Sequence, residues 1–371
     1  MRYSEIQISD IKAKLAHFDI NRREAHAILS CTVSTSNART QIAELSDATN
    51  KLSLQLGMRP VFKRYLLSDA TNQCQFLPER DECARSIIQQ SPLDGSKATV
   101  LAIFQDHSTF KEQGKGVWMD DSGRIWAGDN DELPPADSRQ MTMNYLAEFS
   151  RVLSLSGGTL EDHCVRTWFF VRDVDNNYSG VVDGRNDIFA NHRLTTETHF
   201  IASTGIAGQS PDPSRLVVFN AYADISLHKS QIKFLHGKTH LNPTYEYGVA
   251  FERGTAVDYG DRRHVYISGT ASIDHKGNIV APGDITAQTE RMLENIGVLL
   301  TEGSCTWGDV AHMLVYLRDI ADYQIVSSLM NRRFPRIPIA IVLAPVCRPG
   351  WLIEAECLAV KQTINSGYAP F

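Results

Sequence analysis

The chain has 371 residues, of which 43% are hydrophobic and 22% charged, so it can bury two or three compact cores and is neither disordered nor fibrous. Its 37 basic and 43 acidic residues give a net charge of −6 without a lysine or arginine run, and we therefore expect no nucleic-acid partner. The apolar runs are too short and too interrupted by proline to cross a membrane, and the first ten residues lack a signal peptide's order. We expect a cytoplasmic protein.

The seven cysteines are scattered along the chain, and none of them stands in a CxxC pair. This pattern argues against both a disulfide framework and a zinc ribbon. The histidines form no HExxH motif, which a helical zinc site would require. We expect neither a metal site nor another cofactor.

A first passage of helix and strand signals covers residues 38–105. Apolar residues at helical spacing predict a helix over 38–57, and alternation predicts strands over 59–70 and 98–105. Asp69 stands at the end of the first of these strands. Two hairpin-like strands and a Pro-Pro stop over 116–138 then lead into the next passage.

The second and third passages repeat this order more clearly. The second predicts a helix, a strand that ends in Arg172-Asp173, a second helix and two strands, over 138–158, 164–174, 177–192, 198–208 and 215–225. Loop-like insertions are predicted over 208–215 and 228–243. The third predicts a helix, a strand that ends in Arg318-Asp319, a helix and two strands, over 285–305, 310–320, 321–334, 337–346 and 351–360.

The recurring strand-end aspartates Asp69, Asp173 and Asp319 indicate an internal repeat. We predict an α/β protein of three units, 1–112, 113–232 and 245–362, each with a mixed sheet and two helices on one face. The uncovered sheet faces would meet around a pseudo-threefold axis and leave clefts between the units.

The closing strand over 351–360 carries two carboxylates in an otherwise apolar segment. Alternation places Glu354 and Glu356 on one face, opposite a small apolar set. Burial and mutual repulsion would raise the pKa of one of them and make a general acid available near neutral pH. The alternative is a glutamate that only forms an ion pair between units.

Longer motifs in the third passage carry a family resemblance. The stretch RRHVYISGTASIDHKGNIVAPGDITAQTERMLENIGVLL, followed by WGDVAHMLVYLRDIADYQIV and IEAECLAV, resembles a YjgF/RidA domain from end to end. Over about 160–360, the order VRTWFFV, DGRNDIFANHR, ASTGIAG, NPTYEYGVAFERG and SGTASI is similar to the chorismatases. Those enzymes combine YjgF-like domains in one chain and hydrolyse chorismate with release of pyruvate.

The resemblance implies roles for several residues. Glu354 aligns with the glutamate of both families, as the general acid. Arg166 matches the Arg-Thr-Trp of the chorismatases and Arg253 their Phe-x-Arg, and the planar fork of arginine suits a carboxylate. Arg348, which follows Cys347, is a third candidate for anion binding.

Other residues are candidates for the wall of the pocket. Cys347 lies seven residues before Glu354, where chorismatases that form an aromatic hydroxybenzoate have a cysteine, either as a pocket wall or as a nucleophile-like group. Tyr245 and Thr270 are candidate hydrogen-bond donors, Thr270 on the SGT turn. Turn capping explains these two equally well.

The expected activity is therefore hydrolysis of an enolpyruvyl ether, with a small anionic metabolite as the ligand. Hydrolysis of an enamine or imine, the RidA reaction, is the first alternative, although Ala340 stands where those deaminases have a carboxylate-binding arginine. A non-catalytic metabolite-binding or scaffold protein is the second alternative. Self-association is left open.

Overall fold

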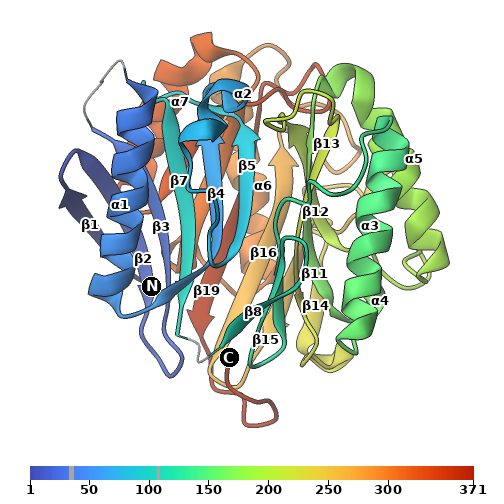
Figure 1. Ribbon diagram of the computed structural model, residues 1–371. Helices are drawn as coiled ribbons and strands as arrows, with labels where there is room; N and C mark the ends of the chain where they lie inside the picture. Colours follow the sequence, from blue (N-terminus) through green and yellow to red (C-terminus); the bar gives the residue numbers. More distant parts are fainter. Residues whose placement is uncertain (33–36, 107–108) are drawn as a thin grey trace.

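The computed structural model describes residues 1–32, 37–106 and 109–371, and its architecture is three β-sheets with the long helices outside them (Figure 1). The fold class expected from the sequence is confirmed. Each sheet is mixed, because one strand pair in it is parallel and the others are antiparallel.

The first sheet has the strand order β1-β2-β3-β7-β4-β5. Its elements are β1 (Arg2–Ile8), β2 (Ile11–Phe18), β3 (Glu24–Cys31), α1 (Ala38–Leu56), β4 (Arg59–Leu67), α2 (Ala70–Gln73), the 3₁₀ turn η1 (Cys74–Phe76), β5 (Ala84–Gln89) and β7 (Ala98–Gln105). The side chain of Asn37 caps α1 at its start, and Gly57 ends it in the left-handed conformation with φ 62°. The second long helix of the predicted unit is reduced here to the single turn of α2.

The second sheet has the order β12-β11-β13-β10-β9-β8. Its elements are β8 (Phe110–Gly114), β9 (Val117–Asp120), β10 (Arg124–Ala127), α3 (Ser138–Leu155), α4 (Leu160–His163), β11 (Cys164–Val171), α5 (Val174–Asn191), β12 (Ala202–Ala207) and β13 (Val217–Asp224). Helices α3 and α5 cover its outer face, on the right in Figure 1.

The third sheet has the order β14-β15-β16-β19-β17-β18-β6. Its elements are η2 (Lys229–Gln231), β14 (Ile232–Leu235), η3 (Thr244–Tyr247), β15 (Gly254–Asp258), β16 (Arg262–Ala271), α6 (Ile285–Glu302), η4 (Trp307–Asp309), β17 (Val310–Leu317), η5 (Ile320–Asp322), α7 (Tyr323–Arg333), β18 (Ile339–Leu343) and β19 (Ile353–Gln362). Two features depart from the prediction. The insertion 228–243 is not only loop, because β14 pairs with β15, and β6 (Ser91–Pro92), from the range assigned to the first unit, pairs with β18.

The recurring aspartates lie where a central strand turns into the helical segment after it. The side chain of Asp69 accepts a hydrogen bond from the backbone N–H of Asn72, and that of Asp319 accepts one from Ala321. Asp173 precedes α5 with φ 49° and lacks such a side-chain bond. Helix capping thus accounts for the repeat at two of the three positions.

The inner faces of the three sheets share one core. A single apolar cluster joins residues of all three, including Phe62, Trp168 and Tyr266. Phe62 stacks against Trp126, with ring centroids 5.1 Å apart. Functional side chains that face this interior are therefore held by elements far apart in the sequence. In the described ranges, no helix combines the length and apolar character needed to cross a membrane.

Candidate active site

Strand β19 carries two buried carboxyl groups toward the interior. In the register, Glu354 is opposite Tyr316 of β17, and Glu356 is opposite Leu314. They are only 5% and 4% exposed. The alternation along the strand predicted this shared face, and the sheet packing gives the two carboxyl groups different surroundings.

Glu356 lies among hydrogen-bond donors and cations from the other two sheets. Its Oε2 accepts hydrogen bonds from Arg166 Nη2 at 2.8 Å and from the Thr204 hydroxyl at 2.5 Å. Its Oε1 accepts one from Trp168 Nε1 at 2.8 Å and lies 3.6 Å from Arg64 Nη1. Both carboxylate oxygens are therefore compensated, as a buried charge requires.

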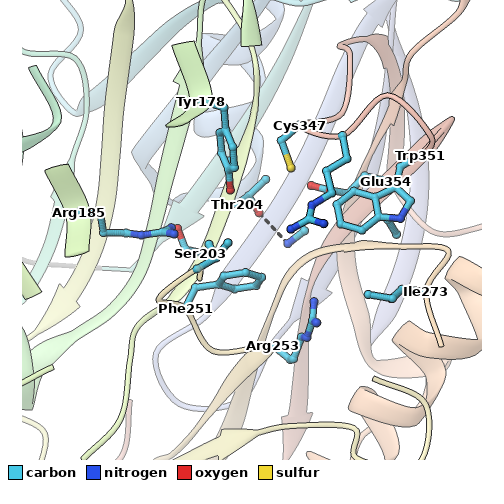
Figure 2. Close-up of a pocket in the computed structure, with 15 residues that line it drawn as sticks. Tyr178, Arg185, Ser203, Thr204, Phe251, Arg253, Ile273, Cys347, Trp351 and Glu354 are labelled. Atoms are coloured by element: carbon cyan, nitrogen blue, oxygen red, sulfur yellow. Dashed lines mark hydrogen bonds between the residues drawn. The ribbon is translucent and has the colours of Figure 1, made fainter. Parts of the chain in front are cut away.

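Glu354 lies in a pocket between the second and third sheets (Figure 2). The space among its lining side chains, with open solvent included, is about 500 Å³. The second sheet and α5 contribute Tyr178, Arg185, Ser203, Thr204 and Gly205, and the third sheet and its flanking loops contribute Val249, Phe251, Arg253, Gly269, Ala271, Ile273, Cys347, Arg348, Trp351 and Glu354.

The surroundings of Glu354 favour its protonated form. Burial is the largest cause, and the charge of Glu356 adds to it, while Arg253 and Arg166 act in the opposite direction; the net effect raises the pKa of Glu354 to about 8. The carboxyl group also packs closely against Gly269, because a Cβ atom at that residue would collide with Glu354 Oε1. The pocket therefore holds a carboxylic acid near neutral pH.

Three arginines line the same pocket. Arg253 donates to the backbone carbonyl of Asn242 at 2.9 Å, and its guanidinium lies 5.4 Å from the centroid of the Phe251 ring. Buried Arg185, from α5, lies 5.9 Å from the same ring. Exposed Arg348 lies 5.3 Å from the ring of Trp351. Figure 2 shows Arg185 and Arg253 approaching the pocket from different elements.

Arg185 is a residue that the sequence reasoning missed. It stands in the DGRNDIFANHR stretch that carries part of the resemblance to the chorismatases, so that motif was the available signal. Its position on helix α5 gave no reason to place it near the closing strand of another unit. Only the packing of the second sheet against the third brings them together.

Arg166 has a different place from the other two arginines singled out in the sequence. Its Nη2 bonds to Glu356 and also contacts Thr204, and its Nη1 donates to the carbonyl of Thr167 at 3.2 Å. It is not among the described residues that line the Glu354 pocket. Arg166 therefore binds Glu356, whereas Arg253 and Arg348 line the pocket of Glu354.

The two candidate hydroxyl donors lie beside the pocket. Tyr245, 53% exposed, lines an adjoining outer groove that shares Phe251 and Arg253 with the pocket. Thr270 is buried and donates its hydroxyl to the carbonyl of Ser268 at 2.9 Å. The SGT segment is an irregularity within strand β16 and not a turn, which corrects the expectation from the sequence.

Cys347 lines the pocket as a thiol. Burial, with the charge of Glu354 as the next cause, raises its pKa to about 12, although a hydrogen bond with Tyr178 acts in the opposite direction. A thiol with such a pKa is almost wholly protonated at neutral pH and is a poor nucleophile. Of the two roles that the resemblance left open, the surroundings favour a pocket wall.

Ala340 does not face Glu354. It lines a separate cavity between β18, α7 and the first sheet. When Asp173 and Asp319 are aligned, Trp168 of the second sheet corresponds to Leu314 of the third. Trp168 pairs with Thr204 and Leu314 pairs with Ala340, so Thr204 and Ala340 occupy equivalent positions. The residue that meets Glu354 at this strand position is therefore Thr204.

The strand pairing in the three sheets also shows which of three cavities, each between two sheets, contains a carboxyl group at the position of Glu354. Counting back three residues from each recurring aspartate gives Leu66, Phe170 and Tyr316, and their antiparallel partners are Thr99, Val218 and Glu354. Each partner lines a different cavity between two sheets. A carboxyl group occupies this position in the third sheet alone.

The described ranges contain no group of three or more histidine, cysteine, aspartate or glutamate side chains placed to hold a metal ion. The pocket itself offers one carboxyl group with a raised pKa, three guanidinium groups, hydroxyl groups and a thiol.

Comparisons with known proteins agree with this arrangement. The model of the family described as Endoribonuclease L-PSP matches residues 254–361. A RutC family protein of Pyrococcus abyssi is 32% identical over 100 residues, which are 26% of this chain and 79% of that protein. The 3-aminoacrylate deaminase RutC of Acinetobacter baylyi is 33% identical over 97 residues, which are 26% of this chain and 77% of that protein.

A solved structure of a chorismatase resembles nearly the whole molecule. It superposes with a TM-score of 0.64 over 81% of this chain and 93% of that chain, at 17% sequence identity. At that identity the likeness shows a shared fold. The RutC relatives, each matched over more than two thirds of its length, show that the chain belongs to the YjgF/RidA family.

Proposed function

We propose that the chain hydrolyses the enolpyruvyl ether of a small anionic molecule and releases pyruvate. The observation that carries the proposal is a buried carboxyl group, with a pKa near 8, in a pocket lined by three arginines. A protonated carboxyl group supplies a general acid, and the guanidinium groups supply sites for substrate carboxylates. The likeness in fold to a chorismatase supports this choice among reactions.

In the proposed reaction, Glu354 gives its proton to the methylene carbon of the enol ether. The π electrons form the new C–H bond, and the ether carbon becomes an oxocarbenium-like centre. Water adds to that carbon, and the hemiketal breaks its bond to the alcohol oxygen, which takes a proton. One ether and one water thus give one pyruvate and one alcohol, and the proton lost by water restores Glu354.

The arginines of the pocket would bind the substrate in this reaction. Arg253 and Arg185 both lie beside the ring of Phe251 in the pocket and would bind the carboxylates of the substrate, with the exposed Arg348 as a third cation. A cation close to the enolpyruvyl carboxylate also limits repulsion between that group and Glu354 after the proton is transferred. Arg166, expected from the sequence to share this task, would act through Glu356 instead.

Hydrolysis of an enamine is the second candidate, favoured by the similarity to the RutC deaminase. Its first step is also protonation of a carbon in a C=C bond that bears a heteroatom, so Glu354 would have the same role. The products differ, because an enamine releases ammonia and an enol ether releases an alcohol. Thr204, which stands where an anion-binding arginine would face Glu354, gives this reaction less support.

The test is pyruvate release from chorismate, followed with lactate dehydrogenase between about pH 5 and 9. If Glu354 is the acid, Glu354→Gln lowers turnover by roughly 10²–10⁴. Glu290→Gln, an exposed glutamate paired with Arg333, is the matched control and keeps wild-type turnover. Absence of pyruvate from the wild type at every pH would reject the reaction, and ammonia release from 2-aminoacrylate or 3-aminoacrylate would then support the deaminase.

A further inference from the structure

We infer that Glu356 is a positioning residue for Glu354: it is a fixed negative charge, held by the first and second sheets, that keeps the proton of the pair on Glu354. The inference rests on the proposed role of Glu354 as the acid, but its first test needs no substrate. It assigns a function to a residue of the interior, since Glu356 is 4% exposed.

The contacts of Glu356 come from two other sheets. Arg64, from β4 of the first sheet, and Arg166, from β11 of the second, bring two guanidinium groups to within 3.6 Å and 2.8 Å of its carboxylate oxygens. Arg64 is 1% exposed, and its guanidinium lies 5.0 Å from the Trp168 ring and 4.8 Å from the Phe170 ring. A cation held between aromatic rings in this way has little freedom to leave its carboxylate.

A second set of contacts fixes the orientation of this group. The Thr204 hydroxyl accepts hydrogen bonds from Arg166 and from the backbone N–H of Gly269, so its one proton is directed to Glu356. Arg64 in turn donates to the side-chain carbonyl of Asn220 at 3.2 Å. Each contact described for Glu356 is with a hydrogen-bond donor or a cation, as a buried negative charge requires.

The surroundings of Glu354 disfavour a negative charge. It is one full strand repeat from Glu356, on the same face and in the same buried region, and the negative charge of Glu356 opposes a second one. The titratable or charged groups around it, from all the elements that pack on it, are Glu356, Tyr316, Arg166, Arg253, Cys347, Arg348, Tyr178 and Arg185. The two carboxyl groups differ in their partners, because the cations lie at Glu356, and this difference makes Glu354 the acid of the pair.

The first test locates the proton directly in the ligand-free protein. The infrared carbonyl band of a protonated carboxylic acid is recorded between pH 5 and 9 for the wild type and for Glu354→Gln. We expect a band with a midpoint near pH 8 in the wild type that is missing from Glu354→Gln, whereas the band of buried Asp129, whose pKa burial raises to about 7, remains in both proteins. A band with a midpoint near pH 8 that persists in Glu354→Gln would show that this proton is not on Glu354 and would overturn the inference.

The second test removes the charge of Glu356. In Glu356→Gln, both the loss of this anion and the release of two cations favour ionisation of Glu354, so the midpoint of its band falls by one pH unit or more. Glu290→Gln, which changes an exposed glutamate paired with Arg333, is the control and retains the wild-type midpoint. An unchanged midpoint in folded Glu356→Gln would also overturn the inference.

If chorismate is a substrate, the pH profile gives a further readout. The alkaline limb of turnover moves to lower pH in Glu356→Gln by the same amount as the infrared midpoint, and at pH 5–6 much of the activity remains. A purely structural role of Glu356 would lower turnover equally at all pH values and would contradict the inference. Failure of the proposed reaction would appear as inactive wild type with the infrared shifts intact.

Discussion

Replacement of Glu354 by glutamine should change how the stability of the fold depends on pH. The pKa of this carboxyl group is raised from 4.5 to about 8 in the folded chain, because it is buried beside Glu356. Below the unfolded value both states are protonated and the group contributes no cost. As pH rises to about 8, the unfolded chain ionises while the folded chain does not, so stability is lost over that range.

The size of the loss follows from the two pKa values. One unit corresponds to about 1.4 kcal/mol, so between pH 5 and pH 8 this group alone lowers the free energy of unfolding by on the order of 4 kcal/mol. Glutamine cannot ionise and removes this dependence. Relative to the wild type, Glu354→Gln should therefore become more stable as pH rises.

Urea unfolding of both proteins at pH 5, 6.5 and 8 measures the effect, because the difference between them cancels the titration of other groups. The surface change Glu290→Gln should show a difference that stays within about 0.5 kcal/mol at each pH. A difference between Glu354→Gln and wild type that is the same at pH 5 and pH 8 would refute the raised pKa and, with it, the acid on which the proposed reaction depends.

Three further changes test other parts of the site. Gly269→Ala introduces a Cβ against Glu354 Oε1, so turnover should fall while circular dichroism stays that of the wild type; unchanged turnover would show that the strand shifts to make room. Arg185→Met should lower kcat/KM by roughly 10–100-fold, as expected for a charge-assisted contact to substrate, and unchanged kinetics would exclude it from binding. Arg64→Met should lower the free energy of unfolding by about 3–5 kcal/mol, since it leaves a buried ion pair incomplete, and a loss below about 1 kcal/mol would contradict a tight pair.

The sequence predicted the local parts of the fold well. Helical spacing and strand alternation located α1, α3, α5, α6 and α7 and the central strands, because those signals depend only on which side of an element is buried. It gave no prediction for β1 to β3, and the strand β14 was predicted as loop. Strand β14 lies at the edge of its sheet, where pairing on one side leaves a weaker hydrophobic pattern.

The candidate site was predictable only in part. Alternation placed Glu354 and Glu356 on one face, and the idea that one of two neighbouring carboxyl groups has a raised pKa follows from their closeness. Which of them is compensated depends on Arg64 and Trp168, whose sheets meet β19 only in the folded molecule. The different locations of Arg166 and Arg253 have the same origin, since only the packing of the sheets shows which of them reaches Glu356 and which the pocket.

The three central strands meet their partners at Leu101, Asn220 and Glu356, and these residues occupy equivalent positions in the three sheets. Three separate but identical chains would have to place the same side chain there three times, and three buried carboxylates could not share one small volume. Joining the repeats covalently lets each copy mutate alone. The third sheet keeps the anion Glu356 at this position. The first sheet has Leu101 there, paired with Arg64, and the second sheet has the neutral amide of Asn220. The unequal distribution of charge among the three repeats, and the position of the acid Glu354 beside Glu356, are thus a consequence of encoding the repeats in one polypeptide.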